Sequence, residues 1–586
     1  MIKLLKNLKP YRLSIMGVIV FIFLQSLSEL YLPTLMSDIV DTGVVNGDVN
    51  YIVRIGGWMI LIAVVAMISS VFGSYLAAKA ATGFGRDLRT KVFTKVESFS
   101  LEEFDEKGTA SLIVRTTNDI TQIQQLAVTM LRMFLRAPLL FIGGIIMAVF
   151  KDAKLSLVLV VILPILTIII LLIAKKGMSL FKSMQIRLDK LNLVLREYLT
   201  GIRVIRAFNR EVYEKKRFHK ANFDLTETAK KVNLLMAVLI PLMMLILNLA
   251  IVAIIWFGSI RINNGGMQVG DLMAFIQYAS QIMFSLIMVS MMFIMVPRAS
   301  VSAIRINEVL DVEPKIKDPM IPKESQLEIE NGIISEKDKR GYLEFDGVSF
   351  CYQGAEEPAI KNISFRSNPG ELTAIIGSTG SGKSTLINLI PRFYDVTSGC
   401  ILIDGVDIRE LTQEKLHAKI GLVSQKVVLF TGTIAENIGF GNHNLSRDEM
   451  IRAAEIAQAS EFISTMKQVY DSQITQGGTN ISGGEKQRLA IARALAKHPE
   501  IYIFDDSFSA LDFKTEAKLR VAIKKETKND TVLIIAQRVT TVMSADQIIV
   551  LDEGKIVGMG KHQDLIRTCN VYREIVASQL SEEELI

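Results

Sequence analysis

The chain has 586 residues, of which 50% are hydrophobic and 22% are charged, and its formal net charge is +6. With a mean hydropathy of +0.34, it is too apolar for an ordinary soluble protein and too charged for a protein that lies entirely in a membrane. The composition also excludes disordered, collagen-like and disulfide-scaffold proteins, and three cysteines indicate neither an oxidising compartment nor a zinc site.

The composition averages two unlike halves. Apolar runs dominate residues 1–300, a charged linker with prolines is expected over 301–340, and residues 341–586 have a polar α/β pattern. A membrane-spanning helix takes about 20 residues, and six stretches of the first half are long enough: 13–35, 52–78, 127–150, 155–174, 233–258 and 272–296. A buried core helix could explain one such stretch but hardly six. The first exceeds the apolar core of a signal peptide, so we expect it to be retained.

Basic residues are concentrated in the two longest segments between spans. Lys and Arg recur over 86–115 and 175–231, whereas the loop DIVDTGVVNGDVN after the first span has none. The positive-inside rule therefore predicts that both termini and both basic segments are cytoplasmic, and the net charge requires no nucleic-acid partner. Each basic segment has helical periodicity and a central glycine, Gly108 or Gly201. We expect two helical hairpins that extend about 35–40 Å from the bilayer and offer their turns to a cytoplasmic domain.

Several polar residues interrupt the predicted spans. Glu29 lies in the first span, Arg132 and Arg136 lie four residues apart in the third, and Gln277 and Gln281 share one face of the sixth. Ionisable groups in spans usually face a cavity or a partner. Glu29, Gln277 and Gln281 are therefore candidate substrate-cavity residues, with helix–helix contacts as the alternative. Arg132 and Arg136 lie near the cytoplasmic side and are interpreted as snorkelling toward it.

A phosphate-binding loop is predicted in the second half. The apolar strand LTAII (372–376) is followed by GSTGSGKST (377–385) and then by an apolar helical run, which is the context that G-x-x-x-x-G-K-S requires. The glycines let backbone N–H groups surround phosphates, Lys383 would face the β- and γ-phosphates, and Ser384 would offer its hydroxyl to Mg²⁺. The predicted ATP-binding residues of this loop are Gly377, Ser378, Thr379, Gly380, Ser381, Gly382, Lys383, Ser384 and Thr385.

Two further segments suit metal or anion chemistry. IYIFDD (501–506) is an apolar strand that ends in acids, and Asp505 is placed to hold Mg²⁺. ISGGE (481–485) precedes a basic helix and offers the open amides of a second anion site. One chain does not need two γ-phosphate sites. We therefore expect this segment to close over ATP held by a second subunit, through Ser482, Gly483, Gly484 and Glu485.

The ordered motifs resemble the ATP-binding-cassette domain, and the six spans before them resemble the half-transporter exporters of that superfamily. The resemblance covers essentially the whole chain. It implies a membrane all-α six-helix transmembrane domain followed by an α/β P-loop NTPase domain that uses ATP and Mg²⁺. By position, it implies that Tyr352 stacks on adenine, that Gln425 touches Mg²⁺ and that Asp512 lies at a dimer contact. It also implies that the turns at Gly108 and Gly201 are coupling regions.

Two positions depart from the family pattern. The family has Glu after the metal-binding Asp, whereas this chain has Asp506, whose carboxylate lies about 1.5 Å further back. A misplacement of about 1 Å can cost on the order of a hundredfold in rate. The family also has a switch His, where this chain has Gln537, which cannot carry a positive charge. With Gln425, these two residues are the candidate catalytic residues of a degenerate site that binds ATP and hydrolyses it slowly.

The sequence therefore predicts one subunit of an ATP-driven exporter of amphipathic drugs or lipids. We expect a multi-pass protein of the bacterial plasma membrane, with both termini and the ATPase domain in the cytoplasm. The expected partner is a second half-transporter subunit, and the departures favour a heterodimer over a homodimer. The alternatives are a dedicated lipid or glycolipid flippase and, from another class, an ATP-gated channel or membrane regulator.

Overall fold

The computed structural model describes residues 1–323, 340–442 and 444–580. The chain forms two compact units, Met1–Ser98 with Lys107–Glu313 and Phe99–Glu106 with Pro314–Ile586. The predicted fold class is confirmed, because the first unit holds six long apolar helices and the second alternates strands with helices. Residues 324–339 of the predicted linker lie outside the described residues, and 301–310 belong to the end of the helix Val269–Leu310.

The helical unit contains six helices that are long and apolar enough to cross a membrane, as predicted. Five of them are α2 (Arg12–Asp38), α3 (Val49–Glu97), α8 (Leu157–Thr200), α10 (Glu211–Asn263) and α11 (Val269–Leu310). The third in chain order is the continuous helical stretch Thr109–Lys151, which includes α6 (Ile120–Thr129) and α7 (Leu135–Lys151). Large apolar side chains on them, such as Trp58, Phe72 and Trp256, are more than half exposed. Helices with such outward faces are expected where lipid surrounds them.

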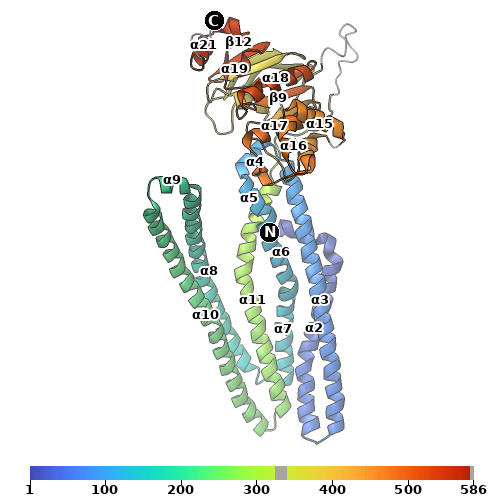
Figure 1. The fold of residues 1–586 in the computed structure, drawn as a ribbon. Coiled ribbons are helices and arrows are strands. Elements are labelled where there is room, and N and C mark those ends of the chain that lie inside the picture. Colours follow the sequence, from blue (N-terminus) through green and yellow to red (C-terminus); the bar gives the residue numbers. More distant parts are fainter. Residues whose placement is uncertain (324–339, 443, 581–586) are drawn as a thin grey trace. The chain divides into compact units, whose positions relative to one another are not determined.

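Four of these helices are much longer than a bilayer requires. α3, α8, α10 and α11 have 49, 44, 53 and 42 residues, or about 63–80 Å each, against a hydrocarbon thickness of about 30 Å. α8 and α10 lie side by side and are joined through the short helix α9 (Ile202–Ala207) (Figure 1). Gly201 separates α8 from α9, and Gly108, with a φ of 71°, separates α4 (Leu101–Lys107) from α5 (Thr109–Val114). The predicted helical extensions and their glycine breaks are confirmed.

The α/β unit is organised around a six-stranded sheet with the order β12-β11-β3-β10-β9-β6. Every neighbouring pair in it is parallel except β11 with β12. Its strands are β3 (Leu372–Gly377), β6 (Ile420–Val423), β9 (Ile501–Asp505), β10 (Thr531–Ile535), β11 (Gln547–Asp552) and β12 (Lys555–Gly560). β10 is buried along its whole length, as expected for a parallel strand that is covered on both faces.

A second, antiparallel sheet has the order β2-β1-β4-β5. Its strands are β1 (Leu343–Phe350), β2 (Ile360–Ser367), β4 (Ser398–Ile403) and β5 (Val406–Asp407). The helices that bear on the site are α12 (Lys383–Leu389), α17 (Gly483–Ala496), α18 (Phe513–Glu526) and α19 (Val539–Val542).

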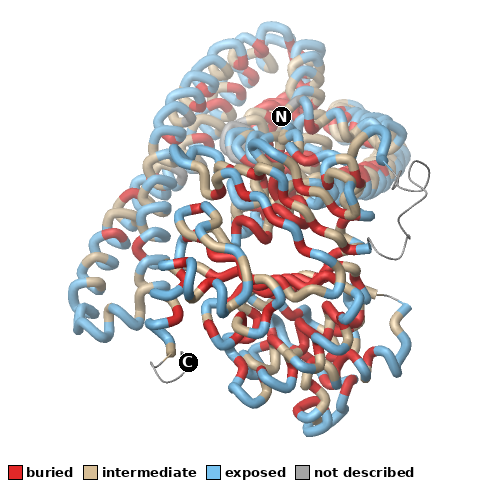
Figure 2. Tube along the Cα trace, turned by 90° about the horizontal axis from the view of Figure 1, so that it is seen from above, coloured by how far each residue is buried: buried red, intermediate tan, exposed pale blue. Residues whose placement is uncertain are grey.

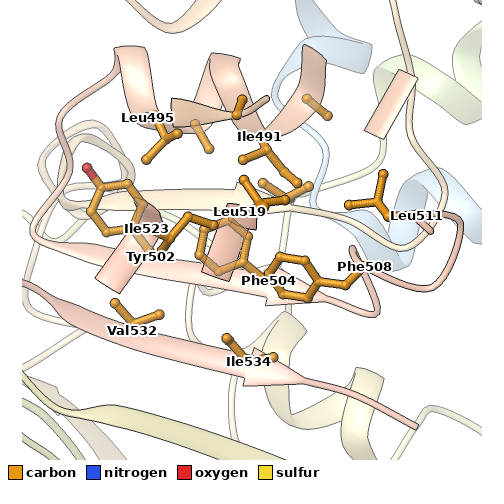
Figure 3. Packing of buried hydrophobic residues seen from close by; sticks show 14 of the residues in the cluster. Ile491, Leu495, Tyr502, Phe504, Phe508, Leu511, Leu519, Ile523, Val532 and Ile534 are labelled. Atoms are coloured by element: carbon orange, nitrogen blue, oxygen red, sulfur yellow. The ribbon is translucent and has the colours of Figure 1, made fainter. Parts of the chain in front are cut away.

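Buried residues concentrate in the strands of the α/β unit, as the burial colours of Figure 2 show. Figure 3 shows side chains of α17 and α18 packed against β9 and β10, among them Ile491, Leu495, Leu519, Ile523, Tyr502, Phe504, Val532 and Ile534. These side chains belong to one buried cluster. The cluster fixes the helices against the strands whose ends carry the candidate site.

Candidate functional site

The candidate residues gather at one edge of the six-stranded sheet. The carboxyl ends of neighbouring parallel strands meet at the same edge, where α/β proteins bind ligands. Loop 377–385 follows β3, Asp505 ends β9, Gln425 lies two residues after β6, and Gln537 lies two residues after β10. The strand order β3-β10-β9-β6 therefore brings the four segments together.

The backbone of loop 377–385 suits a phosphate chain. Gly380 and Gly382 have φ values of 85° and 99°, in the region that favours glycine. A Cβ at Gly377 would lie 2.1 Å from the carbonyl oxygen of Leu551, so a larger residue cannot replace this glycine without a shift. A Cβ at Gly380 would meet no described atom within 4 Å. The loop is thus tightly held at its start and open at its centre, which fits a cradle for phosphates.

Lys383 lies at the start of α12 with its ammonium group folded over the loop. Its Nζ donates to the carbonyl oxygens of Gly377 at 2.9 Å and Ser378 at 2.7 Å. Burial lowers the pKa of Lys383, and the nearby carboxylates of Asp506 and Asp505 oppose this shift. The hydroxyl of Ser381 is a third partner at 3.4 Å, so a phosphate at the loop would meet a partly buried cation whose present partners are all neutral.

Asp505 has the surroundings of a cation-binding acid. Burial raises the pKa of its carboxyl group, and the adjacent charge of Asp506 raises it further, so a bound cation would relieve both effects. Asp505, Ser384 and Gln425 offer the oxygen donors that suit Mg²⁺. Among the described residues, no cluster of three or more His, Cys, Asp or Glu could hold a metal. Mg²⁺ at this edge would be held jointly by these protein oxygens and by nucleotide phosphates.

The two departing residues, Asp506 and Gln537, are in contact. Nε2 of Gln537 lies 3.4 Å from Oδ2 of Asp506, and Nε2 of Gln425 lies 3.3 Å from the same oxygen. Asp506 has a φ of 45°, and its backbone N–H donates to the carbonyl oxygen of Ile535 at 2.9 Å. Burial raises the pKa of Asp506, and the Gln425 hydrogen bond opposes the shift. Two neutral amides therefore hold the acid that follows the metal-binding Asp.

Tyr352 presents part of its ring beside the phosphate-binding segment. Its ring packs edge-on against Phe350 and Tyr394, with centroid distances of 4.8 and 5.5 Å, and its hydroxyl lies 3.0 Å from Oγ1 of Thr385. The Tyr352 side chain is 37% exposed. A planar base could stack on this exposed part, as the sequence predicts.

The short helix α4 packs within the same α/β unit and reaches this aromatic group. The hydroxyl of Tyr394 donates to Oδ2 of Asp105 on α4 at 3.2 Å. Nζ of Lys315 lies 2.6 Å from Oε1 of Glu102, also on α4, and 3.3 Å from Oε1 of Gln353. The helix before Gly108 thus packs within the α/β unit, whereas the docking of a cytoplasmic domain on the Gly108 and Gly201 turns stays a prediction. Sequence reasoning missed Tyr394, which nothing in its local sequence marks.

The SGG segment forms the N-terminus of α17. Ser482 and Glu485 make a capping box, in which Oγ of Ser482 accepts from the Glu485 N–H at 3.4 Å and Oε2 of Glu485 accepts from the Ser482 N–H at 2.7 Å. Ile481 packs against the buried cluster. The signature of the family that these motifs resemble reads LSGGQ, so Ile481 and Glu485 depart from it, and both departures support local structure. Within the described chain, no hydrogen bond joins 482–485 to loop 377–385.

Gln487 connects α17, the helix that begins after Ser482, to Asp506, and sequence reasoning did not identify it. Its Nε2 lies 3.4 Å from the carbonyl oxygen of Asp506, and its Oε1 accepts from the N–H of Ala510 at 3.3 Å. A polar residue on the otherwise apolar inward face of this basic helix was the available signal. Asp512, the predicted dimer-contact residue, caps α18 by accepting from the Thr515 N–H at 2.9 Å, and this bond lowers the pKa of Asp512.

In the helical unit, the interpretation that Arg136 snorkels is wrong. Its Nη2 lies 2.7 and 2.8 Å from the two carboxylate oxygens of Glu29 on α2. This acid neutralises Arg136 within the span, so the guanidinium group does not need to reach the membrane surface. Nε2 of Gln281 on α11 donates to the carbonyl oxygen of Glu29 at 3.2 Å, so the helix–helix alternative is confirmed for Glu29 and Gln281. Gln277 is exposed. A substrate role for these residues stays a prediction.

Comparisons with known proteins agree with this architecture. Residues 15–286 match the model of the ABC transporter transmembrane region, and residues 360–509 match that of the ABC transporter. The uncharacterized ABC transporter ATP-binding protein YfiB of Bacillus subtilis (strain 168) is 41% identical over 582 residues, which are 99% of each chain. An ATP-dependent lipid A-core flippase of Pseudomonas aeruginosa is 33% identical over 537 residues, which are 92% of this chain and 87% of that protein.

A solved structure has the same fold over nearly its full length. The structure of a bacterial Atm1-family ABC exporter with ATP bound matches with a TM-score of 0.81 and 26% identity, and the match covers 97% of this chain and 99% of that one. The chain therefore belongs to the ABC transporter family and is an exporter-type half-transporter with an ATP-hydrolysing domain.

Proposed function

We propose that this chain is one of two unlike subunits of an exporter for amphipathic drugs or lipids in the bacterial plasma membrane. Its α/β unit and both termini face the cytoplasm. Its own ATP site hydrolyses slowly, and its segment 482–485 completes a faster site on the partner. The observation that carries this proposal is the contact between Asp506 and Gln537, because both departures affect the same point of one site.

The physical argument concerns the attacking water. An acid that activates water must reach it, and a misplacement of about 1 Å can cost on the order of a hundredfold. Asp506 is one methylene shorter than Glu, and its Oδ2 already accepts from Gln425 and Gln537. Gln537 can donate a hydrogen bond but cannot bring positive charge to a γ-phosphate. We infer that this site holds nucleotide but activates water poorly.

The residues for nucleotide binding are intact. Tyr352 offers its ring to the base, Lys383 can turn from the loop carbonyls to phosphate oxygens, and Ser384 and Asp505 can hold Mg²⁺ with Gln425. When bound, Mg²⁺–ATP would supply the terminal phosphoryl group, whose transfer to water releases the free energy for transport. Ser482 and the two following glycines remain available at the start of α17, because the capping box leaves the Ser482 hydroxyl free to donate.

A dedicated lipid flippase is the second candidate for transport. The relatives named ATP-dependent lipid A-core flippase support it, and it differs from a drug exporter only in the transported molecule. An ATP-gated channel or regulator would bind ATP without pumping. Substrate-stimulated ATP hydrolysis and uphill accumulation in vesicles would separate a pump from either of these.

The subunit arrangement is tested by purification. The chain is purified alone and together with a second half-transporter that has Glu and His at the positions of Asp506 and Gln537. We expect low ATPase activity from the chain alone and a large gain from the pair. The matched control is the same pair with that Glu changed to Gln, which should return to the low rate. Brisk hydrolysis and transport by the chain alone, with no gain from the partner, would establish a homodimer instead.

A further inference from the structure

A cavity of about 180 Å³ lies in the helical unit between α2, α3 and the third span. Its wall combines polar side chains, among them Ser70, Ser74, Arg132 and Arg136, with apolar ones such as Met133 and, from α11, Met288. At about 30 Å³ per water molecule, this is room for roughly six waters. Pockets for whole drug-sized ligands have about 300–1,000 Å³, so the cavity suits one polar group of a larger molecule.

The positive charges of the cavity exceed the negative ones. Arg136 is neutralised by Glu29, whose two carboxylate oxygens both lie within 2.8 Å of its Nη2. Arg132, one helical turn earlier, is exposed on the wall. It has no hydrogen-bond or ion-pair partner in the described ranges. The single carboxylate cannot neutralise two guanidinium groups, so the cavity retains one uncompensated positive charge.

Other donors around the cavity also lack acceptors. Nε of Arg136 is buried and has no hydrogen-bond partner among the described atoms. Ser70 and Ser74 of α3 line the cavity, and no hydrogen bond of their hydroxyls is found in the described part of the chain. A buried donor without an acceptor costs free energy. The two guanidinium groups and two hydroxyls that line this one small cavity therefore suit an acceptor-rich anion.

The depth of Arg132 indicates where such an anion would come from. Arg132 precedes Lys151, the last residue of α7, by nineteen residues, or about 29 Å of helix. The hydrocarbon core of a bilayer is about 30 Å thick. If Lys151 marks the outer boundary, Arg132 lies at the inner boundary, where the head groups of the inner leaflet begin. The apolar part of the wall, with Ile22, Met133 and Met288, suits the body of an amphipathic molecule.

We propose that this cavity binds the anionic group, a phosphate or a carboxylate, of an amphipathic molecule at the level of the inner leaflet. Arg132 is its principal charge partner, and Arg136, Ser70 and Ser74 supply further hydrogen bonds. This inference rests on the proposed export function and narrows its substrate class to amphiphiles with an anionic head. A cationic head would leave the charge of Arg132 uncompensated, and a zwitterionic head would bring a second positive group beside the two arginines.

Lipid retention by the full-length chain tests this inference. The purified chain is equilibrated with micelles that contain equal amounts of phosphatidylglycerol, which is anionic, and phosphatidylcholine, which is zwitterionic. Native mass spectrometry then measures the ratio of the two lipids retained. We expect Arg132→Gln to reduce the preference for phosphatidylglycerol about tenfold, the loss typical of one hydrogen bond to a charged group. Arg132→Lys should keep most of it.

The matched control is Lys176→Gln, which removes one positive charge from an exposed position of α8 outside the cavity. It should keep the wild-type preference, and equal melting temperatures of the variants will show that they are folded. An equal loss in Lys176→Gln would assign the preference to general surface charge and overturn the inference. Wild-type preference in Arg132→Gln, or no preference in the wild type, would also overturn it.

A competition experiment distinguishes the two possible sources of the anion, a lipid head group and a free phosphate compound. Soluble glycerol 3-phosphate is added as a competitor at millimolar concentration. Competition that depends on Arg132 would support the anion site and assign it to free phosphate compounds, whereas resistance to competition would support a lipid head group. The measurement requires no ATP hydrolysis, so its outcome is independent of whether this chain's own ATP site is slow.

Discussion

Gln537 donates a hydrogen bond to Asp506, with 3.4 Å between Nε2 and Oδ2, so the two residues that depart from the family pattern lie in one contact. Each substitution alone could be compatible with hydrolysis. Together they replace a longer acid and an ionisable ring by a short acid and a neutral amide at the same place. The proposed asymmetry of the transporter depends on this contact.

Restoring both family residues should activate the site. The test uses the assembled pair with the partner's own catalytic Glu changed to Gln, so that hydrolysis at the partner's site is low. In this background we expect the double change Asp506→Glu and Gln537→His to raise ATP hydrolysis at least about tenfold. The longer acid recovers the reach toward the attacking water that Asp506 lacks by about one bond length. The two single variants serve as controls and should gain less. An unchanged rate in the double variant would show that these two departures are not what limits hydrolysis at this site.

Removing the loop cation should affect binding more than transport. Lys383→Ala removes the ammonium group that now contacts the carbonyl oxygens of Gly377 and Ser378. We expect a fluorescent ATP analogue to bind this chain about ten- to a hundredfold more weakly, the loss typical of charge-assisted hydrogen bonds. Transport by the pair should fall less than with the matching lysine of the partner. The control is Lys555→Ala, an exposed change on β12, which should leave nucleotide binding unchanged. An equal loss of transport from Lys383→Ala and from the same change in the partner's matching lysine would contradict unequal sites.

The bond between Tyr394 and Asp105 should couple the nucleotide site to α4. Tyr394→Phe keeps the ring that packs against Tyr352 but removes the hydroxyl that donates to Asp105 at 3.2 Å. We therefore expect nucleotide affinity to stay near the wild-type value while stimulation of the ATPase by substrate decreases. Asp105→Asn should give a weaker form of the same effect, because its amide oxygen can still accept. A loss of nucleotide affinity without a loss of stimulation would point to a purely local role.

The polar residues of the spans should separate into structural and substrate-facing ones. Glu29→Gln leaves Arg136 without its carboxylate, and we expect this to destabilise the protein by about 1–3 kcal/mol, the range for an unsatisfied buried group. Gln277 is exposed, so Gln277→Ala should leave the melting temperature unchanged and alter the relative efflux rates of several dyes. The measurements are thermal melting and efflux at matched expression. A wild-type melting temperature for Glu29→Gln would contradict the structural role of Glu29. Unchanged efflux of every dye in Gln277→Ala would contradict the substrate-facing role of Gln277.

Much of this architecture follows from local sequence signals. The six apolar stretches, the helical extensions beyond them and the breaks at Gly108 and Gly201 were predictable, because each depends on the periodicity or flexibility of neighbouring residues. The strand–loop–helix at 372–389 and the strand that ends at Asp505 were predictable for the same reason.

Contacts between distant residues were not predictable in this way. Arg136 and Glu29 are 107 positions apart, and Tyr394 and Asp105 are 289 positions apart. Nothing in the neighbourhood of either residue reveals its partner, so Arg136 was interpreted from its position in the span alone. The capping role of Glu485 is the opposite case, because the S-x-x-E spacing from Ser482 was visible in the sequence.

The most direct test compares two single changes in this one chain within the assembled transporter. Asp506→Asn removes the acid of its own site, and Ser482→Ala removes the hydroxyl that we propose acts at the partner's site. We expect Asp506→Asn to leave steady-state ATP hydrolysis within about twofold of the wild type, because a slow site contributes little to the total. Ser482→Ala should reduce it about tenfold or more, and Glu485→Gln, which restores the family residue and can still cap α17, is the control. A loss with Asp506→Asn as large as that with Ser482→Ala would contradict the proposal that this chain's own site is slow.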